Sequence, residues 1–160
     1  MRRDIWLVPA ADSAESRPFI QTEFDERSIA LSPDGQWLAY VSDATGQDQV
    51  FVRPVPGPGG QNQVSIDGGM EPMWSMDGSK VYYRSRTHMM AVAVQTTPNF
   101  SVGTRERLFE DVYVKNTSVA NYDVHPEDGR FLMISGATEI PSLVVVLNWY
   151  EELRQRTGGN

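Results

Sequence analysis

Early in the chain stands Ser32-Pro33-Asp34-Gly35-Gln36-Trp37-Leu38-Ala39-Tyr40-Val41-Ser42-Asp43, a tight polar turn that runs into an alternating, aromatic-rich strand. Glycine suits such a turn because it adopts a positive φ without a Cβ clash, and the proline fixes the preceding torsion. Within residues 37–42, alternate side chains point to opposite faces, and both faces are largely apolar. The stretch therefore predicts a hairpin turn followed by a buried strand.

The same pattern occurs twice more in the chain. Residues 75–86 keep the Ser-x-Asp-Gly turn and the strand, and residues 126–135 keep them with one residue inserted. Asp34 and Asp77 are 43 residues apart, whereas Asp77 and Asp128 are 51 residues apart. Four predicted strands in a period of about 40–45 residues are typical of a β-propeller blade. The surplus of the last spacing falls in the connection before the third repeat, which we expect to be a long loop.

The repeats predict one all-β domain that forms a portion of a propeller, with about three blades per chain. The expected parts are a half-blade at 1–23, a blade at 24–66, a blade at 67–110, an incomplete blade at 111–147, and a C-terminal helix and tail at 148–160. Within these parts we expect thirteen strands. The fourth strand of the second full blade is expected at residues 107–109 only.

Composition narrows the classes of function. The chain is 40% hydrophobic and 22% charged, which is typical of a globular domain, and its net charge of −7 disfavours binding to nucleic acid. The absence of cysteine excludes disulfides, thiolate nucleophiles and cysteine-ligated zinc. The apolar run at 5–11 is too short for a signal peptide, and the run at 143–147 is too short to cross a membrane. We expect no membrane insertion, and either a cytoplasmic or a periplasmic location.

The turn-and-strand motif at 32–43, with Val-Phe-Val-Arg-Pro at 50–54, resembles the repeat of TolB-like β-propellers. More narrowly, Glu-Pro-Met-Trp-Ser-Met-Asp-Gly at 71–78 and Leu-Asn-Trp-Tyr-Glu-Glu-Leu at 147–153 resemble the C-terminal propellers of some bacterial serine/threonine kinases. The resemblance covers nearly the whole chain. It implies a fold, and it implies little about function, because the motif residues build blades.

A portion of a propeller leaves strand edges without partners, and open edges promote aggregation. We therefore expect a homodimer in which the N-terminal strands of one copy complete the last blade of the other, giving six blades around a two-fold axis. A well-folded monomer at micromolar concentration in light scattering would contradict this expectation.

Candidate site residues follow from the register of the repeats. The innermost strand of each blade lines the central channel, which places Ser28, Glu71 and Asn121 at one level and Asp123 further along the same face. Tyr113 and Lys115, with Asn116 beside them, lie in the long connection, where they are expected to overhang the channel mouth. These side chains are the predicted ligand-binding residues.

Three classes of function stay open. The leading one is a non-catalytic module that binds a peptide, a protein or a small ligand at the channel mouth. A second is a calcium-dependent hydrolase analogous to the gluconolactonase and paraoxonase type, with Glu71, Asn121 and Asp123 as metal ligands and His125 as the base. A third is the accessory propeller of a prolyl-oligopeptidase-like hydrolase. No cofactor is required by the first, and Ca²⁺ is required by the second.

Against the calcium interpretation stands a structural one, in which Glu71 and Asn121 cap strand ends and His125 replaces the turn serine of the other repeats. The chain also lacks the Gly-x-Ser-x-Gly elbow and the Ser-x-x-Lys helix of serine hydrolases. Four tryptophans, at 6, 37, 74 and 149, are expected at comparable positions between blades.

Overall fold

The computed structural model describes residues 2–10 and 15–136, and in these it contains strands and no α-helix. The strands are β1 (Ile5–Leu7), β2 (Arg17–Ile20), β3 (Arg27–Leu31), β4 (Trp37–Ser42), β5 (Gln49–Pro54), β6 (Asn62–Gln63), β7 (Met70–Trp74), β8 (Lys80–Arg84), β9 (His88–Gln95), β10 (Ser101–Glu110), β11 (Tyr122–Val124) and β12 (Phe131–Met133).

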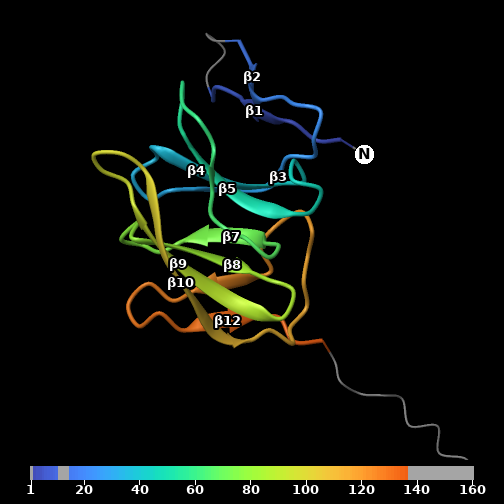
Figure 1. Cartoon of the computed structure of the whole chain (residues 1–160), viewed down its shortest axis with the longest axis vertical. Coiled ribbons are helices and arrows are strands. Elements are labelled where there is room, and N and C mark those ends of the chain that lie inside the picture. The colour runs from blue at the N-terminus through green and yellow to red at the C-terminus, as the bar shows by residue number, and fades with distance from the viewer. Residues whose placement is uncertain (1, 11–14, 137–160) are drawn as a thin grey trace, which may run out of the picture.

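The strands form four antiparallel sheets that follow one another along the chain. Sheets β3–β6 and β7–β10 have four strands each, and every strand pairs with its neighbours in sequence. Before and after them lie two-stranded sheets, β1–β2 and β11–β12. Figure 1 shows the sheets stacked from the N-terminal end of the described chain to the C-terminal end. The all-β fold and the four-stranded repeat are confirmed.

The structure differs from the sequence-based expectation in the lengths of two strands. Strand β10 covers ten residues instead of the expected three, because it pairs along nearly all of β9 through two register shifts. Strand β6 covers only Asn62–Gln63. The polar composition of residues 101–106 hid the long strand, since its side chains alternate weakly. The strand expected at 143–147 and the helix expected at 148–156 lie outside the described residues.

The repeated turns have the geometry that the sequence predicts. Gly35 and Gly78 have positive φ values of 71° and 70°. In the first turn the Ser32 hydroxyl donates to Asp34 over 2.5 Å, and in the second the Ser75 hydroxyl donates to Asp77 over 2.6 Å. In both, the same serine oxygen accepts the backbone N–H that begins the next strand. The serine and the aspartate therefore connect the two strands of each hairpin.

The second turn gives stability that depends on pH. Hydrogen bonds from Ser75 and Ser79 lower the pKa of Asp77 to about 2 from its ordinary value of 3.8. A carboxylate whose pKa is lowered by folding stabilises the fold above its unfolded pKa, and this stability is lost as pH falls through the folded value. We expect D77N to be less stable than the wild type at pH 7, and the difference to disappear between about pH 4 and about pH 2. Urea unfolding across this range measures it, and a difference that is constant with pH would contradict it.

Strand β4 separates two parts of the core because its alternate side chains face opposite neighbours. Ala39 and Val41 pack toward the β7–β10 sheet in a cluster that contains Val50, Val52, Val64, Trp74, Val81, Tyr83 and Val92. Leu38 and Tyr40 pack toward the β1–β2 sheet with Ile5, Ile20 and Phe51. The core therefore lies between blades, as in a propeller.

The tryptophans do not occupy comparable positions, so that expectation was wrong. Trp74 ends the innermost strand β7, is 7% exposed, and donates its indole N–H to the Ala30 carbonyl of the preceding sheet over 3.2 Å. Trp37 begins the second strand β4 and packs against Phe100 at the β9–β10 hairpin with ring centroids 5.0 Å apart. Trp6 lies on β1 and is 50% exposed. Trp149 lies outside the described residues.

Candidate functional site

The innermost strands of the two complete blades contain the same irregularity. Ser28 in β3 and Glu71 in β7 have positive φ values of 51° and 52°, and in each strand the register shifts around that residue. A positive φ is strained for a residue with a Cβ atom and persists only where the surroundings hold it. This irregularity interrupts the regular pairing of each strand with its neighbour. At Glu71 it lies beside a cluster of buried charges.

Glu71, Arg84 and Asp111 form a buried ion-pair cluster, and their side chains have no exposed surface. The Arg84 guanidinium donates two hydrogen bonds of 2.7 Å to the two Asp111 oxygens and one of 3.3 Å to Glu71. Burial alone raises the pKa of Asp111, but the hydrogen bonds and charge of Arg84 outweigh it, so the pKa is lowered and the group stays ionised. The cluster is thus one cation between two anions.

The cluster holds the long connection that follows β10. We call residues 112–119 the strap. Arg84 donates to the strap carbonyls of Tyr113 and Val114 over 3.0 and 2.6 Å. The Glu71 carboxylate accepts the backbone N–H of Asn116 over 2.7 Å and that of Asn121, just beyond the strap, over 2.6 Å. A segment without regular strand pairing therefore has its backbone groups bound by buried charges, which keeps it in one conformation.

The far end of the strap reaches the first two sheets. Arg27 on β3 donates its Nε–H to the Thr117 carbonyl over 2.9 Å, and Arg3, just before β1, donates to the Ser118 hydroxyl over 3.0 Å. Both arginines also bind Asp25, and its pKa is lowered chiefly by the hydrogen bonds from Arg3. Figure 1 shows the strap as an orange segment that runs from the β11–β12 end of the molecule toward β3. The strap therefore contacts the β7–β10 sheet, strand β3 and the segment just before β1.

The strap presents apolar side chains to solvent although its backbone is fixed. Val112 is 76% exposed, Val119 is 57% exposed and Val114 is 40% exposed. Asn116 fixes the turn between them, because its side-chain oxygen accepts the Ser118 N–H over 2.7 Å. Exposed apolar residues on a fixed loop are typical of surfaces that bind another molecule.

The structure brings together only some of the predicted site residues. Glu71 and Asn121 meet, but through the Asn121 backbone N–H. Asp123 is exposed on β11, and its carboxylate accepts the N–H of Val124. Ser28 is buried at 8% exposure, on the sheet before Glu71.

Two predicted residues of the strap serve as anchors. Lys115 donates to the carbonyls of Ser85 and Arg86 over 3.1 and 2.8 Å, and its ammonium lies 3.3 Å from Asp111. The Tyr113 ring packs edge-on against Phe109, with centroids 6.5 Å apart. Both side chains join the strap to the β7–β10 sheet.

His125 stands where the other repeats have the turn serine. Its Nδ1 lies 3.1 Å from an Asp128 oxygen, as the serine hydroxyls lie near Asp34 and Asp77, although the orientation does not make a hydrogen bond. Its backbone N–H donates to the Arg130 carbonyl across the turn. His125 therefore occupies the same place in its turn as Ser32 and Ser75 occupy in theirs.

The calcium interpretation requires Glu71 to exchange its present partners for a metal ion. Both Glu71 oxygens accept hydrogen bonds, and within residues 2–10 and 15–136 no three His, Asp or Glu side chains are grouped to hold a metal. Calcium binding and the hydrolase chemistry built on it stay predictions. Melting temperatures with excess calcium and with a chelator test them, because a ligand of the native state raises its stability.

The fold of this chain is similar to that of solved TolB structures. A protein of Agrobacterium tumefaciens assigned as TolB superposes with a TM-score of 0.57 and 21% identity over 82% of this chain. The fold is TolB-like. TolB of Acinetobacter baumannii is also similar, with a TM-score of 0.43 and 13% identity over 80% of this chain. The chain spans 49% and 42% of the lengths of these two proteins, about half of a TolB-like structure.

The other comparisons give no further assignment. No protein-family model matches the sequence, and no curated protein matches it. The narrower resemblance to the propellers of bacterial kinases therefore stays a prediction. Among the described residues there is no helix long and apolar enough to span a bilayer.

Arg84 and Asp111 belong to the buried ion-pair cluster, and the sequence reasoning missed both of them. In the 43-residue register Arg84 corresponds to Val41, which is fully buried in the first complete blade. An arginine in place of a buried valine signals a buried ion pair, because an unpaired charge there is strongly unfavourable. The two acids that pair with it are separated from it by 13 and 27 residues and are not identified by spacing alone.

Proposed function

We propose that this chain is a non-catalytic binding module that recognises a peptide or a segment of another protein at the channel-mouth face of a TolB-like propeller. The observation that carries the proposal is the strap, whose backbone is fixed by Glu71 and Arg84 while Val112 and Val119 remain exposed. A loop that is ordered before binding loses little conformational entropy when a partner docks. The TolB-like fold supports a binding role in general, because propellers commonly present ligand sites at one face.

A peptide or protein fits the strap better than a small polar ligand does. The exposed groups are branched apolar side chains separated by backbone and hydroxyl groups of Thr117 and Ser118. Such a surface buries apolar side chains of a partner and offers hydrogen bonds beside them, which is the usual composition of a protein interface. A small ligand needs an enclosed pocket to bury most of its surface.

Selection from a random-peptide phage library tests the proposal. We expect sequences that enrich on the wild type and that bind the double variant V112S/V119S at least about tenfold more weakly, since each valine loses its apolar contribution. The matched control is M76S, because Met76 is 69% exposed and lies in the β7–β8 turn, at the opposite end of that sheet from the β8–β9 turn that Lys115 contacts. A library that yields no enriched sequence, or peptides that bind V112S/V119S as well as the wild type, would contradict it.

Homodimerisation belongs to the same proposal. The β1–β2 pair of one copy and the β11–β12 pair of another together supply four strands, which is the number of strands in each complete blade. Leu132 and Ile134, at and just after β12, are exposed apolar residues that such a contact would cover. Light scattering at micromolar concentration tests this part, and a well-folded monomer would overturn it without affecting the peptide site.

A further inference from the structure

A pocket of about 480 Å³ lies between the two complete blades, away from the valines of the strap. One wall is the β6–β7 connection with Asp67, and the others are the β8–β9 turn and strands β9 and β10. Its lining residues are Ile66, Asp67, Gly68, Tyr83, Ser85, Arg86, Thr87, His88, Met90, Arg105 and Arg107. The volume is in the range of sites that bind small molecules.

The charge of this pocket is opposite to that of the protein. The chain has a net charge of −7, yet three arginines line the pocket against a single acid. Gathering cations without acidic partners costs free energy unless an anion is bound there. Arg107 makes no side-chain hydrogen bond or ion pair with any described residue, and the same is true of Arg86.

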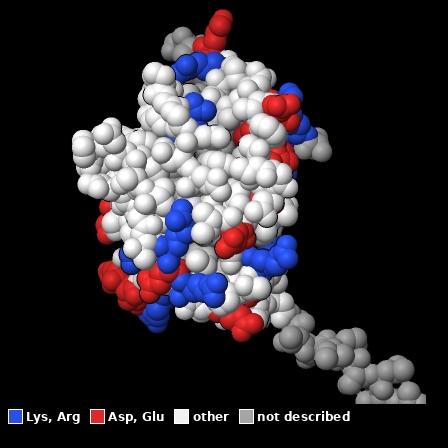
Figure 2. Space-filling model, viewed as in Figure 1, with Lys and Arg blue, Asp and Glu red and all other residues white. Residues whose placement is uncertain are grey.

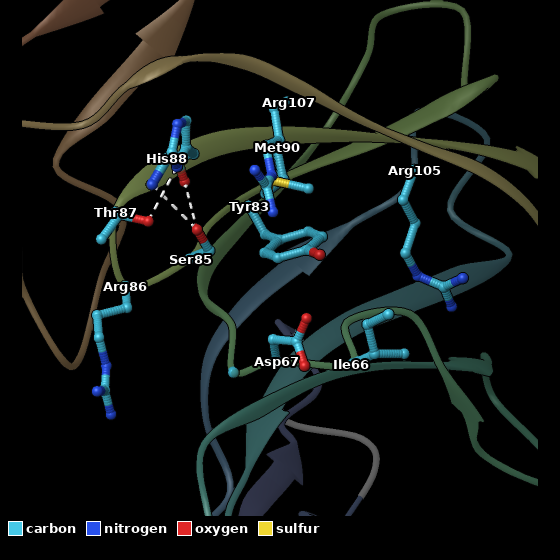
Figure 3. Close-up of a pocket in the computed structure, with 11 residues that line it drawn as sticks. Ile66, Asp67, Tyr83, Ser85, Arg86, Thr87, His88, Met90, Arg105 and Arg107 are labelled. Carbon is cyan, nitrogen blue, oxygen red and sulfur yellow. Dashed lines mark hydrogen bonds between the residues drawn. The ribbon is translucent and has the colours of Figure 1, made fainter.

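Several of the donors are held in place. Arg105 and Arg107 are two residues apart in β10 and therefore lie on one face of it. The Arg105 Nε–H donates to the Val64 carbonyl of the neighbouring sheet over 2.8 Å, which fixes the guanidinium and leaves its terminal N–H groups free. Figure 3 shows Arg107 above the Tyr83 ring and Asp67 below it, with Arg105 beside them and Arg86 extending away from the group.

The histidine and the tyrosine add further donors. The β8–β9 turn is closed by hydrogen bonds between Ser85 and His88, and the Thr87 hydroxyl lies 2.9 Å from His88 Nδ1. When that hydroxyl donates to Nδ1, Nε2 carries a proton and is a donor. Burial raises the pKa of Tyr83, with Asp67 adding to the increase and Arg105 opposing it, so its hydroxyl keeps its proton.

We infer that this pocket binds the carboxylate or phosphate group of a small molecule. Arg105 and Arg107 supply charged N–H donors in the fork geometry that matches both oxyanions, and Tyr83 and His88 line the same space with further donors. Asp67 faces the same space and weakens the attraction. Figure 2 shows basic and acidic side chains interspersed on the lower part of the molecule in this view.

Amide NMR titration of the full chain tests the inference with phosphate and with succinate as probes, against sodium chloride at matched ionic strength. We expect saturable shifts of the amides around Gly68 and His88 with an oxyanion and none with chloride. Binding of only one of the two probes supports the inference and names the chemical class of the ligand. The absence of saturable shifts with both overturns it.

Variants separate a specific site from general electrostatics. R107Q should weaken oxyanion binding about tenfold or more, because it removes a charged hydrogen bond. K80Q makes the same change of net charge on the exposed start of β8 and should leave binding unchanged. Equal losses in R107Q and K80Q, or no loss in R107Q, would overturn the site.

A substitution of Asp67 should change the affinity for oxyanions in the opposite direction from R107Q. D67N should tighten oxyanion binding, because it removes the negative charge of the acid that lines this pocket. Weaker binding in D67N would show that the acid holds part of the ligand, which would overturn an anion site in favour of a zwitterion site. The strap variant V112S/V119S should bind the oxyanions like the wild type, so this site and the peptide site succeed or fail separately.

Discussion

Replacing Arg84 by methionine should lower the free energy of unfolding by about 3–5 kcal/mol. Arg84 lies without exposed surface between Glu71 and Asp111, so the variant leaves Glu71 without its cation and leaves Asp111 with Lys115 alone. It also removes the donors for the strap carbonyls of Tyr113 and Val114. Urea unfolding monitored by tryptophan fluorescence measures the loss.

The strap should respond beyond the general loss of stability. In R84M we expect amide hydrogen exchange of the strap to increase more than that of β4 and β5, because only the strap is held by this cluster. The matched control is R130M, since Arg130 is an exposed residue whose partner Asp128 lies in the same turn, and such ion pairs contribute about 0–1 kcal/mol. Equal stability of R84M and R130M would contradict the role given to the cluster.

Replacing Trp74 by alanine should cost about 3–5 kcal/mol, the usual loss for a large buried aromatic side chain. Trp74 fills the space between the two complete sheets and donates a hydrogen bond to the Ala30 carbonyl. The variant therefore removes apolar contacts, opens a cavity and leaves the partly buried Ala30 carbonyl without its donor. Thermal and urea unfolding should both show the loss.

Trp6 is the control for the tryptophan prediction. Because it is half exposed on β1, W6A should cost clearly less than W74A. W74F should give an intermediate loss, since phenylalanine keeps most of the apolar volume but lacks the indole donor. Equal losses of stability in W6A and W74A would contradict the role given to Trp74 between the two sheets.

The turns and central strands were predictable because their causes are local. Gly35 and Gly78 adopt positive φ, and the serine and aspartate beside them bond to each other within a few residues. The alternation in residues 37–42 indicated correctly that β4 is buried on both faces. The weak alternation of β10 concealed it, because that strand is defined by its pairing with β9.

The candidate site was predictable only in part. The repeat register correctly singled out Ser28 and Glu71 as equivalent positions, and both have the unusual positive φ. It assigned Glu71 to the channel, whereas the carboxylate is turned to Arg84 and the strap. Tyr113 and Lys115 were placed correctly on the long connection, but they anchor it to the sheet below.

The sequence by itself determined the repeat, its turns and the all-β, TolB-like fold, because these depend on torsions and alternation within a few residues. Only the tertiary structure decided where the charges go. Arg84 meets acids 13 and 27 residues away, and Asp67 faces arginines about 40 residues further along the chain. The stacking of blades and the unfavourable free energy of burying an unpaired charge determine these partners. Neither can be inferred from the spacing of the residues along the chain.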